Sequence, residues 1–104
     1  MELIEIQKKI EKFTNEKNLN ISPNVRIIDL VSEVGEMAKE ILKATDYGKK
    51  NFIANEDWQE EMGDVLFSLI CLANSTDINL EESLYKVLKK YEERFNIKGD
   101  IGSD

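Results

Sequence analysis

The chain of 104 residues is long enough for one domain with a modest core, and its net charge of -7 argues against a nucleic-acid backbone or an anionic membrane as partner. It contains no histidine and one cysteine, which excludes zinc sites made of His and Cys, catalytic triads that use His, and an internal disulfide. The start lacks the continuous apolar core of a signal peptide, and no segment reaches the roughly 18 apolar residues of a membrane span, so we expect a cytoplasmic protein.

Two helices are predicted in the first half of the chain. Residues 2–17 place apolar side chains at steps of three and four, which indicates an amphipathic helix. A loop should follow, and Ser22 before Pro23 is typical of an N-cap with proline at the first helical position. The second helix, of about 20 residues, should be buried over a wide arc that Glu33 and Glu36 interrupt.

A third helix is predicted after a polar connection. It should begin between Phe52 and Glu56, and Asn51 and Asn55 are both candidate caps. Residues 65–73 of this helix are apolar on nearly all sides. A helix that is apolar all round must be covered all round, so we expect a second subunit to supply part of the cover. The chain is therefore predicted to form a homodimer or a homotetramer.

The last third of the chain predicts a fourth helix and a tail. Residues 76–79 form a break, and the spacing of Asn79 and Glu82 resembles a capping box at the start of the helix. We expect a domain of residues 1–96 and a flexible C-terminal tail of residues 97–104. Four helices with short connections predict an all-α, four-helix bundle-like fold.

Two pairs of carboxylates have matched spacing: Glu33 with Glu36, and Glu61 with Asp64. Residues three apart on a helix differ by about 60° in direction and about 4.5 Å in height, so each pair points from one face. If the second and third helices pack antiparallel, the two pairs should lie nearly side by side. That much like charge is costly unless protons or cations neutralise it. A hard divalent cation such as Mg²⁺, which takes oxygen ligands, would do so.

These acids could instead be ordinary solvated helix surface, because acidic residues occupy 21 of the 104 positions. Their apolar neighbours favour a site, since the pairs lie within LVSEVGEMA and EEMGDVLF. Each pair also encloses a glycine, Gly35 or Gly63, although glycine inside a helix costs roughly 1 kcal/mol relative to alanine. Close approach of a partner helix or a ligand would explain that cost.

The pattern E-x-x-E, then 24 residues, then E-x-x-D, in the contexts LVSEVGEMAKEIL and WQEEMGDVLFSLICLA, closely resembles the MazG-like nucleotide pyrophosphohydrolases. This all-α superfamily includes dimeric dUTPases and phosphoribosyl-ATP pyrophosphohydrolases. The resemblance implies hydrolysis of a nucleoside or deoxynucleoside triphosphate between the α and β phosphates, giving a monophosphate and pyrophosphate. It also implies Mg²⁺, with Mn²⁺ as a substitute, held by four catalytic acids: Glu33, Glu36, Glu61 and Asp64.

The resemblance extends to a basic pair on the predicted fourth helix. Lys90 and Arg94 match a lysine and an arginine that the family places for the phosphates, although they could equally form salt bridges with nearby Glu residues. The family commonly has an asparagine two residues before this lysine, where this chain has Leu88.

A carboxylate that is not fully committed to the metal could position or deprotonate the attacking water.

Two alternatives to a nucleoside triphosphate pyrophosphohydrolase stay open at this point. A phosphoribosyl-ATP pyrophosphohydrolase would use the same acids on a different substrate. A non-catalytic helical oligomerisation module would use them only to keep its surface solvated. Metal binding separates the enzymes from the module.

Overall fold

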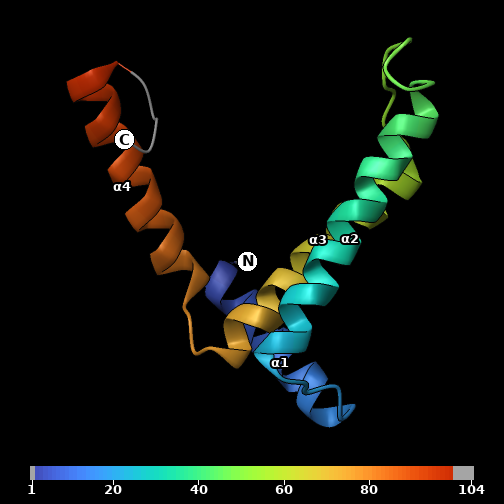
Figure 1. Ribbon diagram of the computed structural model, residues 1–104. Helices are drawn as coiled ribbons and strands as arrows, with labels where there is room; N and C mark the ends of the chain where they lie inside the picture. Colours follow the sequence, from blue (N-terminus) through green and yellow to red (C-terminus); the bar gives the residue numbers. More distant parts are fainter. Residues whose placement is uncertain (1, 100–104) are drawn as a thin grey trace.

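The computed structural model describes residues 2–99, which form four helices (Figure 1). No strand occurs within this range, so the all-α prediction is confirmed. None of these helices is both long enough and apolar enough to cross a membrane. The helices are α1 (Leu3–Glu16), α2 (Pro23–Ala44), α3 (Glu56–Ser75) and α4 (Leu80–Lys98).

Local capping sets where α3 and α4 begin. The Asn55 side chain accepts a hydrogen bond from the Trp58 backbone N–H at 2.9 Å, and Asn79 accepts one from the Glu82 N–H at 3.2 Å. Both contacts satisfy N–H groups that have no partner within the first helical turn. Ser22 occupies the N-cap of α2 before the proline, as predicted, but its side chain makes no capping hydrogen bond.

The end of α4 differs from the prediction. The helix continues through residues 97 and 98, which belong to the predicted tail, and Gly99 is its C-cap. Gly99 has a left-handed φ of 79°, a conformation that glycine adopts without steric cost and that commonly terminates helices. The rest of the predicted tail, residues 100–104, lies outside the described residues.

The predicted hairpin of α2 and α3 forms the largest packed unit, and α1 packs against α3. The ring of Phe13 on α1 meets that of Phe67 on α3 edge to face, with 6.3 Å between their centroids. Among residues 2–99, the buried apolar side chains are those of Ile70, Cys71 and Ala73, all on α3. The apolar run predicted from the sequence is therefore a helix, and Cys71 is a core residue.

α4 diverges from this unit and forms the other arm of a V (Figure 1). Its main packing partner is α1. At the vertex, the buried Gln7 side chain donates hydrogen bonds to the Asn74 side chain at 3.2 Å and to the Ile78 carbonyl at 2.9 Å. Its own carbonyl oxygen accepts from the Leu80 N–H at 2.7 Å. Gln7 thus ties α1 to the end of α3 and to the first turn of α4.

A single chain leaves much apolar surface uncovered. Its radius of gyration is 16.8 Å, compared with about 13 Å for a compact domain of this length. Ile28 and Val31 on α2 are 69% and 64% exposed, and Phe95 on α4 is 60% exposed. Leu66, within the apolar run of α3, is 48% exposed. The described residues therefore build a core that is small for their apolar content.

Candidate active site

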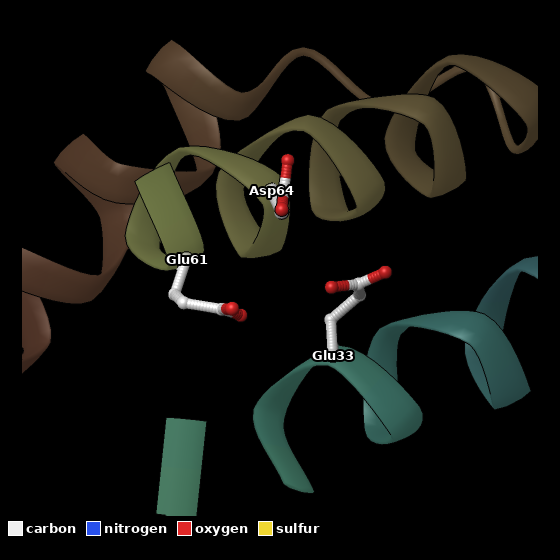
Figure 2. Close-up of side chains that lie close together, drawn as sticks. All are labelled: Glu33, Glu61 and Asp64. Atoms are coloured by element: carbon white, nitrogen blue, oxygen red, sulfur yellow. The ribbon is translucent and has the colours of Figure 1, made fainter. Parts of the chain in front are cut away.

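Three of the four predicted acids converge across the hairpin. Glu33 from α2 and Glu61 from α3 point toward one another across the space between the helices, and Asp64 lies about one turn after Glu61 on α3 (Figure 2). Each residue offers a carboxylate oxygen, and these three oxygens lie within 4.8 Å of one another. We call Glu33, Glu61 and Asp64 the acidic cluster. Its geometry follows from the three-residue step between Glu61 and Asp64 and from the antiparallel packing of two helices joined by one loop.

The fourth predicted acid, Glu36, lies beside the cluster. It is exposed and is not part of the group whose oxygens lie within 4.8 Å. Its charge nevertheless acts on the cluster, because it raises the pKa of both Glu33 and Glu61 more than any other neighbouring charge does. The convergence of four acids that we predicted is therefore an arrangement of three acids with Glu36 at the edge.

The pKa values of Glu33 and Glu61 are both raised, and partial burial is the largest cause. It raises the pKa of Glu33 and of Glu61 above their ordinary value of 4.5, and neighbouring carboxylates raise both pKa values further. After Glu36, the carboxylates that act on Glu33 are those of Asp64, Asp29 and Glu61. After Glu36, those that act on Glu61 are Asp64, Glu40 and Asp57.

One oxygen in the cluster lacks a partner. Oε2 of Glu61 is buried and accepts no hydrogen bond from any residue in the range 2–99. A buried carboxylate oxygen without a donor is destabilising, so it calls for a proton or a cation. The cluster contains only oxygen donors, which is the ligand type that Mg²⁺ and Mn²⁺ prefer over nitrogen or sulfur. The donor set, the unpartnered oxygen and the raised pKa values all fit a hard divalent cation.

Asp29 is a neighbour of the cluster that the sequence reasoning missed. It lies one helical turn before Glu33, and its carboxylate accepts a hydrogen bond from the buried Ser68 hydroxyl at 3.3 Å. The sequence does contain a signal for Asp29, because this residue is four positions before Glu33 and therefore on the same face of α2. The E-x-x-E spacing instead predicts that Glu36 is the partner of Glu33.

The two glycines do not serve close packing of α2 on α3. A Cβ atom added to Gly35 or Gly63 would meet nothing within 4 Å. Our expectation that a partner helix approaches closely here is therefore wrong for the two helices of the hairpin. Both positions face open space at the level of the cluster.

Lys90 and Arg94 lie on α4, away from the acidic cluster of the same chain (Figure 1). The Lys90 ammonium sits 5.3 Å from the centroid of the Tyr91 ring, a cation–π contact. Within residues 2–99, the ion pair present is between Lys12 and Glu16. Neither Lys90 nor Arg94 forms a salt bridge within this range. The alternative that they are salt-bridged to nearby Glu residues is not supported in this part of the chain.

The model of the MazG nucleotide pyrophosphohydrolase domain matches residues 22–97, which include every predicted site residue. The chain belongs to this family. It is a nucleotide pyrophosphohydrolase, and this assignment separates it from the non-catalytic oligomerisation modules considered above. The matched segment begins at α2, so α1 lies outside it.

Relatives of known sequence and structure agree with the family assignment. The protein YpjD of Bacillus subtilis (strain 168) is 40% identical over 94 residues, which cover 86% of this chain and 83% of YpjD. A crystal structure of YpjD superposes with a TM-score of 0.75 at 37% identity, over 90% of this chain and 96% of that one. The Bacillus-conserved MazG protein, a nucleotide pyrophosphohydrolase, superposes with a TM-score of 0.73 at 33% identity, over 88% and 89%.

Proposed function

We propose that this MazG family member hydrolyses a nucleoside or deoxynucleoside triphosphate between the α and β phosphates, and that the reaction depends on Mg²⁺, with Mn²⁺ as a substitute. The observation that carries the proposal is the convergence of three carboxylates from two helices, one of which has a buried oxygen, Oε2 of Glu61, that accepts no hydrogen bond within residues 2–99. In the reaction a water oxygen bonds to phosphorus, the bridging P–O bond breaks, and the water loses a proton. The products are a nucleoside monophosphate and pyrophosphate.

Glu33, Glu61 and Asp64 are the proposed metal ligands, because their oxygens already share one small space. When bound, Mg²⁺ supplies positive charge that offsets the acids and the negative charge that develops on the phosphates. Glu36 is exposed beside the cluster and completes the ligand set or orients the attacking water. A carboxylate in that position can accept the proton that the water loses.

The proposed phosphate contacts come from a second copy of the chain. Lys90 and Arg94 lie on the arm opposite the acidic cluster, so one chain does not bring the two sets of residues together (Figure 1). The exposed apolar side chains of α2 and α4, such as Val31 and Phe95, need cover, which a second copy provides. A homodimer in which α4 of one protomer lies along the hairpin of the other would meet both requirements.

The catalytic proposal is tested by measuring pyrophosphate release from a panel of ribonucleoside and deoxyribonucleoside triphosphates with Mg²⁺ present. We expect at least one nucleotide to give its monophosphate and pyrophosphate in equal amounts, and we expect EDTA to stop the reaction. Including phosphoribosyl-ATP in the panel tests the other substrate class. Release of single phosphates, or full activity in EDTA, would contradict the proposal.

The assembly is tested separately by sedimentation over a range of concentrations. We expect a dimer or a tetramer at micromolar concentration, and Val31→Glu should shift the population toward the monomer by placing a charge on the exposed apolar face. Glu16→Gln, an exposed change on α1, is the matched control and should leave the assembly unchanged. A chain that sediments only as a monomer would contradict the shared site while leaving the metal proposal open.

A further inference from the structure

A cavity of about 250 Å³ lies where the end of α1, the loop after it, the start of α2 and the end of α3 meet. Its lining includes Asn15, Asn20, Arg26 and Asn74, together with Glu11. Arg26 precedes Glu33 by seven residues, which is about 10 Å along α2, so the cavity is distinct from the acidic cluster. Part of its lining also precedes residue 22, where the match to the family domain begins.

Arg26 is a buried cation that forms no ion pair within the part of the chain that the structure describes. The residue is only 8% exposed, and its guanidinium donates a hydrogen bond to the Leu19 carbonyl. Within residues 2–99, no carboxylate oxygen lies within 4.0 Å of its guanidinium nitrogens. Burial of a charge without a partner is costly, and a guanidinium has five N–H donors, most of which stay available here.

Within residues 2–99, two neighbouring groups, Cys71 and Asp29, form no ion pair with Arg26. The buried Cys71 also lines the cavity, and although the Arg26 charge acts the other way, burial raises the pKa of the Cys71 thiol overall. This keeps the thiol uncharged. Asp29, one turn further along α2, has its carboxylate directed to the Ser68 hydroxyl. The positive charge is therefore left facing the cavity.

Side-chain amides add further donors to the same space. The Asn20 amide donates to the Asn15 side-chain oxygen at 2.6 Å, and the Asn74 amide donates to the Gln7 carbonyl at 3.1 Å. Each amide nitrogen carries two hydrogens, so Asn20 and Asn74 each retain one donor, and the amide of Asn15 retains both of its donors. The lining also includes the exposed acid Glu11, which adds negative charge and no donor, and the apolar side chain of Ile21.

We propose that this cavity binds a small oxyanion, the phosphate or carboxylate group of a small molecule, with Arg26 as its counter-charge. A guanidinium matches such groups in a two-point geometry, and neighbouring amides can donate to the remaining oxygens. The volume greatly exceeds the roughly 30 Å³ that one water occupies in the liquid, which leaves room for an ion of the size of phosphate. The site does not depend on the proposed hydrolysis, because the acidic cluster contributes nothing to it.

The test titrates the metal-free full chain with inorganic phosphate, and in parallel with acetate, at an ionic strength held constant with sodium chloride. NMR follows the side-chain amide signals of Asn15, Asn20 and Asn74 and the Nε signal of Arg26. We expect these signals to shift and saturate, and we expect the melting temperature to rise by about 4 °C or more at saturation. Binding of phosphate alone identifies a phosphate ligand, and equal binding of acetate identifies a carboxylate ligand.

Two charge changes at the cavity should act in opposite directions. Arg26→Gln should weaken phosphate binding at least about tenfold, because it removes the counter-charge. Glu11→Gln should tighten binding severalfold by removing a like charge, whereas Glu5→Gln, an exposed change on the same helix but outside the lining, should not. If Arg26→Gln does not fold, the Glu11 pair and the NMR titration decide the question. Shifts that do not saturate, that chloride reproduces, or that are indifferent to Glu11→Gln would overturn the site.

Discussion

The hairpin of α2 and α3 and the arm formed by α4 differ in how much of their environment one chain supplies. The hairpin brings together residues 28 positions apart in sequence, such as Glu33 and Glu61, and its α3 side contains the buried core. α4 contacts α1 and is tied at its first turn by Gln7, but Leu84 and Phe95 along its length are 52% and 60% exposed. One chain brings the acids of the hairpin together, but it leaves apolar side chains exposed on α4 and also on α2, where Ile28 and Val31 are 69% and 64% exposed.

This difference has a consequence for the chemistry. The acidic cluster carries only negative charge, which must be offset before a polyphosphate can approach it. The cationic residues that the family places at the phosphates, Lys90 and Arg94, lie on the open arm. If the active site combines both regions, then assembly and catalysis are coupled, and substitutions in the two regions should lower activity in different ways.

The largest effect is expected in the hairpin. Glu61→Gln should lower hydrolysis by about 100-fold or more, because it removes charge from a proposed metal ligand whose buried Oε2 has no hydrogen-bond partner within residues 2–99. Pyrophosphate release measures the loss, and circular dichroism should show unchanged helix content. Since glutamine has nearly the size of glutamate, packing should be retained.

The matched control for this change is Glu60→Gln. Glu60 is exposed and is rotated by about 100° from its neighbour on α3, so it points away from the cluster. We expect activity within about twofold of the parent. Equal activity of both variants and the parent would remove the acidic cluster from the mechanism.

A smaller effect is expected on the α4 arm. Arg94→Ala should lower kcat/KM by about tenfold or more through loss of a charge-assisted phosphate contact. Mixing this variant with Glu61→Gln tests whether the arm acts on the partner. In a mixed dimer with sites shared between protomers, one site carries both changes and the other carries neither. About a quarter of the parent activity should therefore return after random exchange of subunits.

The alternative arrangement gives a different result. If each chain completes its own site, every site in the mixture carries one of the two changes, and no activity returns. The separate homodimers, assayed at the same total concentration, are the baseline for both outcomes. Absence of recovery in a mixture that has verifiably exchanged subunits would therefore place Arg94 in the same chain's site or outside any site.

The sequence predicts the features that depend on residues close together in the chain, such as the helix caps and the spacing of the acids. Asn55 and Asn79 cap their helices because a side-chain oxygen reaches an N–H three residues on. The acidic cluster follows from a three-residue step on each of two helices joined by one loop. The direction of α4 does not follow from such rules, because it depends on Gln7, which contacts residues more than 65 positions away. No spacing motif marks that contact.

The two residues that the sequence reasoning overlooked illustrate the same limit. Asp29 and Arg26 lie on α2 among apolar residues, and their roles depend on what α3 and the loop before α2 place against them. Ser68 is 39 positions from Asp29 and donates a hydrogen bond to its carboxylate. Arg26 donates a hydrogen bond to the carbonyl of Leu19, which lies in the loop before α2. A polar residue within an apolar stripe could have been noted as unusual, but its partner is a property of the tertiary packing.

Metal binding should have a moderate effect on stability. We expect Mg²⁺ or Mn²⁺ at saturation to raise the melting temperature by about 4 °C or more, because the cation binds the folded cluster and relieves its repulsion. Sodium chloride at equal ionic strength is the control for screening. The double variant Glu33→Gln/Glu61→Gln should lose the response. A melting temperature of the parent that is indifferent to both cations would count heavily against the metal site.

The smallest effect should appear in the pH dependence of the metal-free protein. The folded-state pKa of Glu33 and of Glu61 is raised above the ordinary value of 4.5, so folding favours their protonated forms. This contribution to stability is fully present below pH 4.5 and is lost as the pH rises through the raised folded-state values. In urea unfolding at a series of pH values, the double glutamine variant should therefore gain stability relative to the parent as the pH increases. A difference between the two proteins that is constant with pH would show that the acids do not strain the fold. A difference that grows would mean that the acids which make the hairpin reactive also weaken it, as expected of residues retained for chemistry.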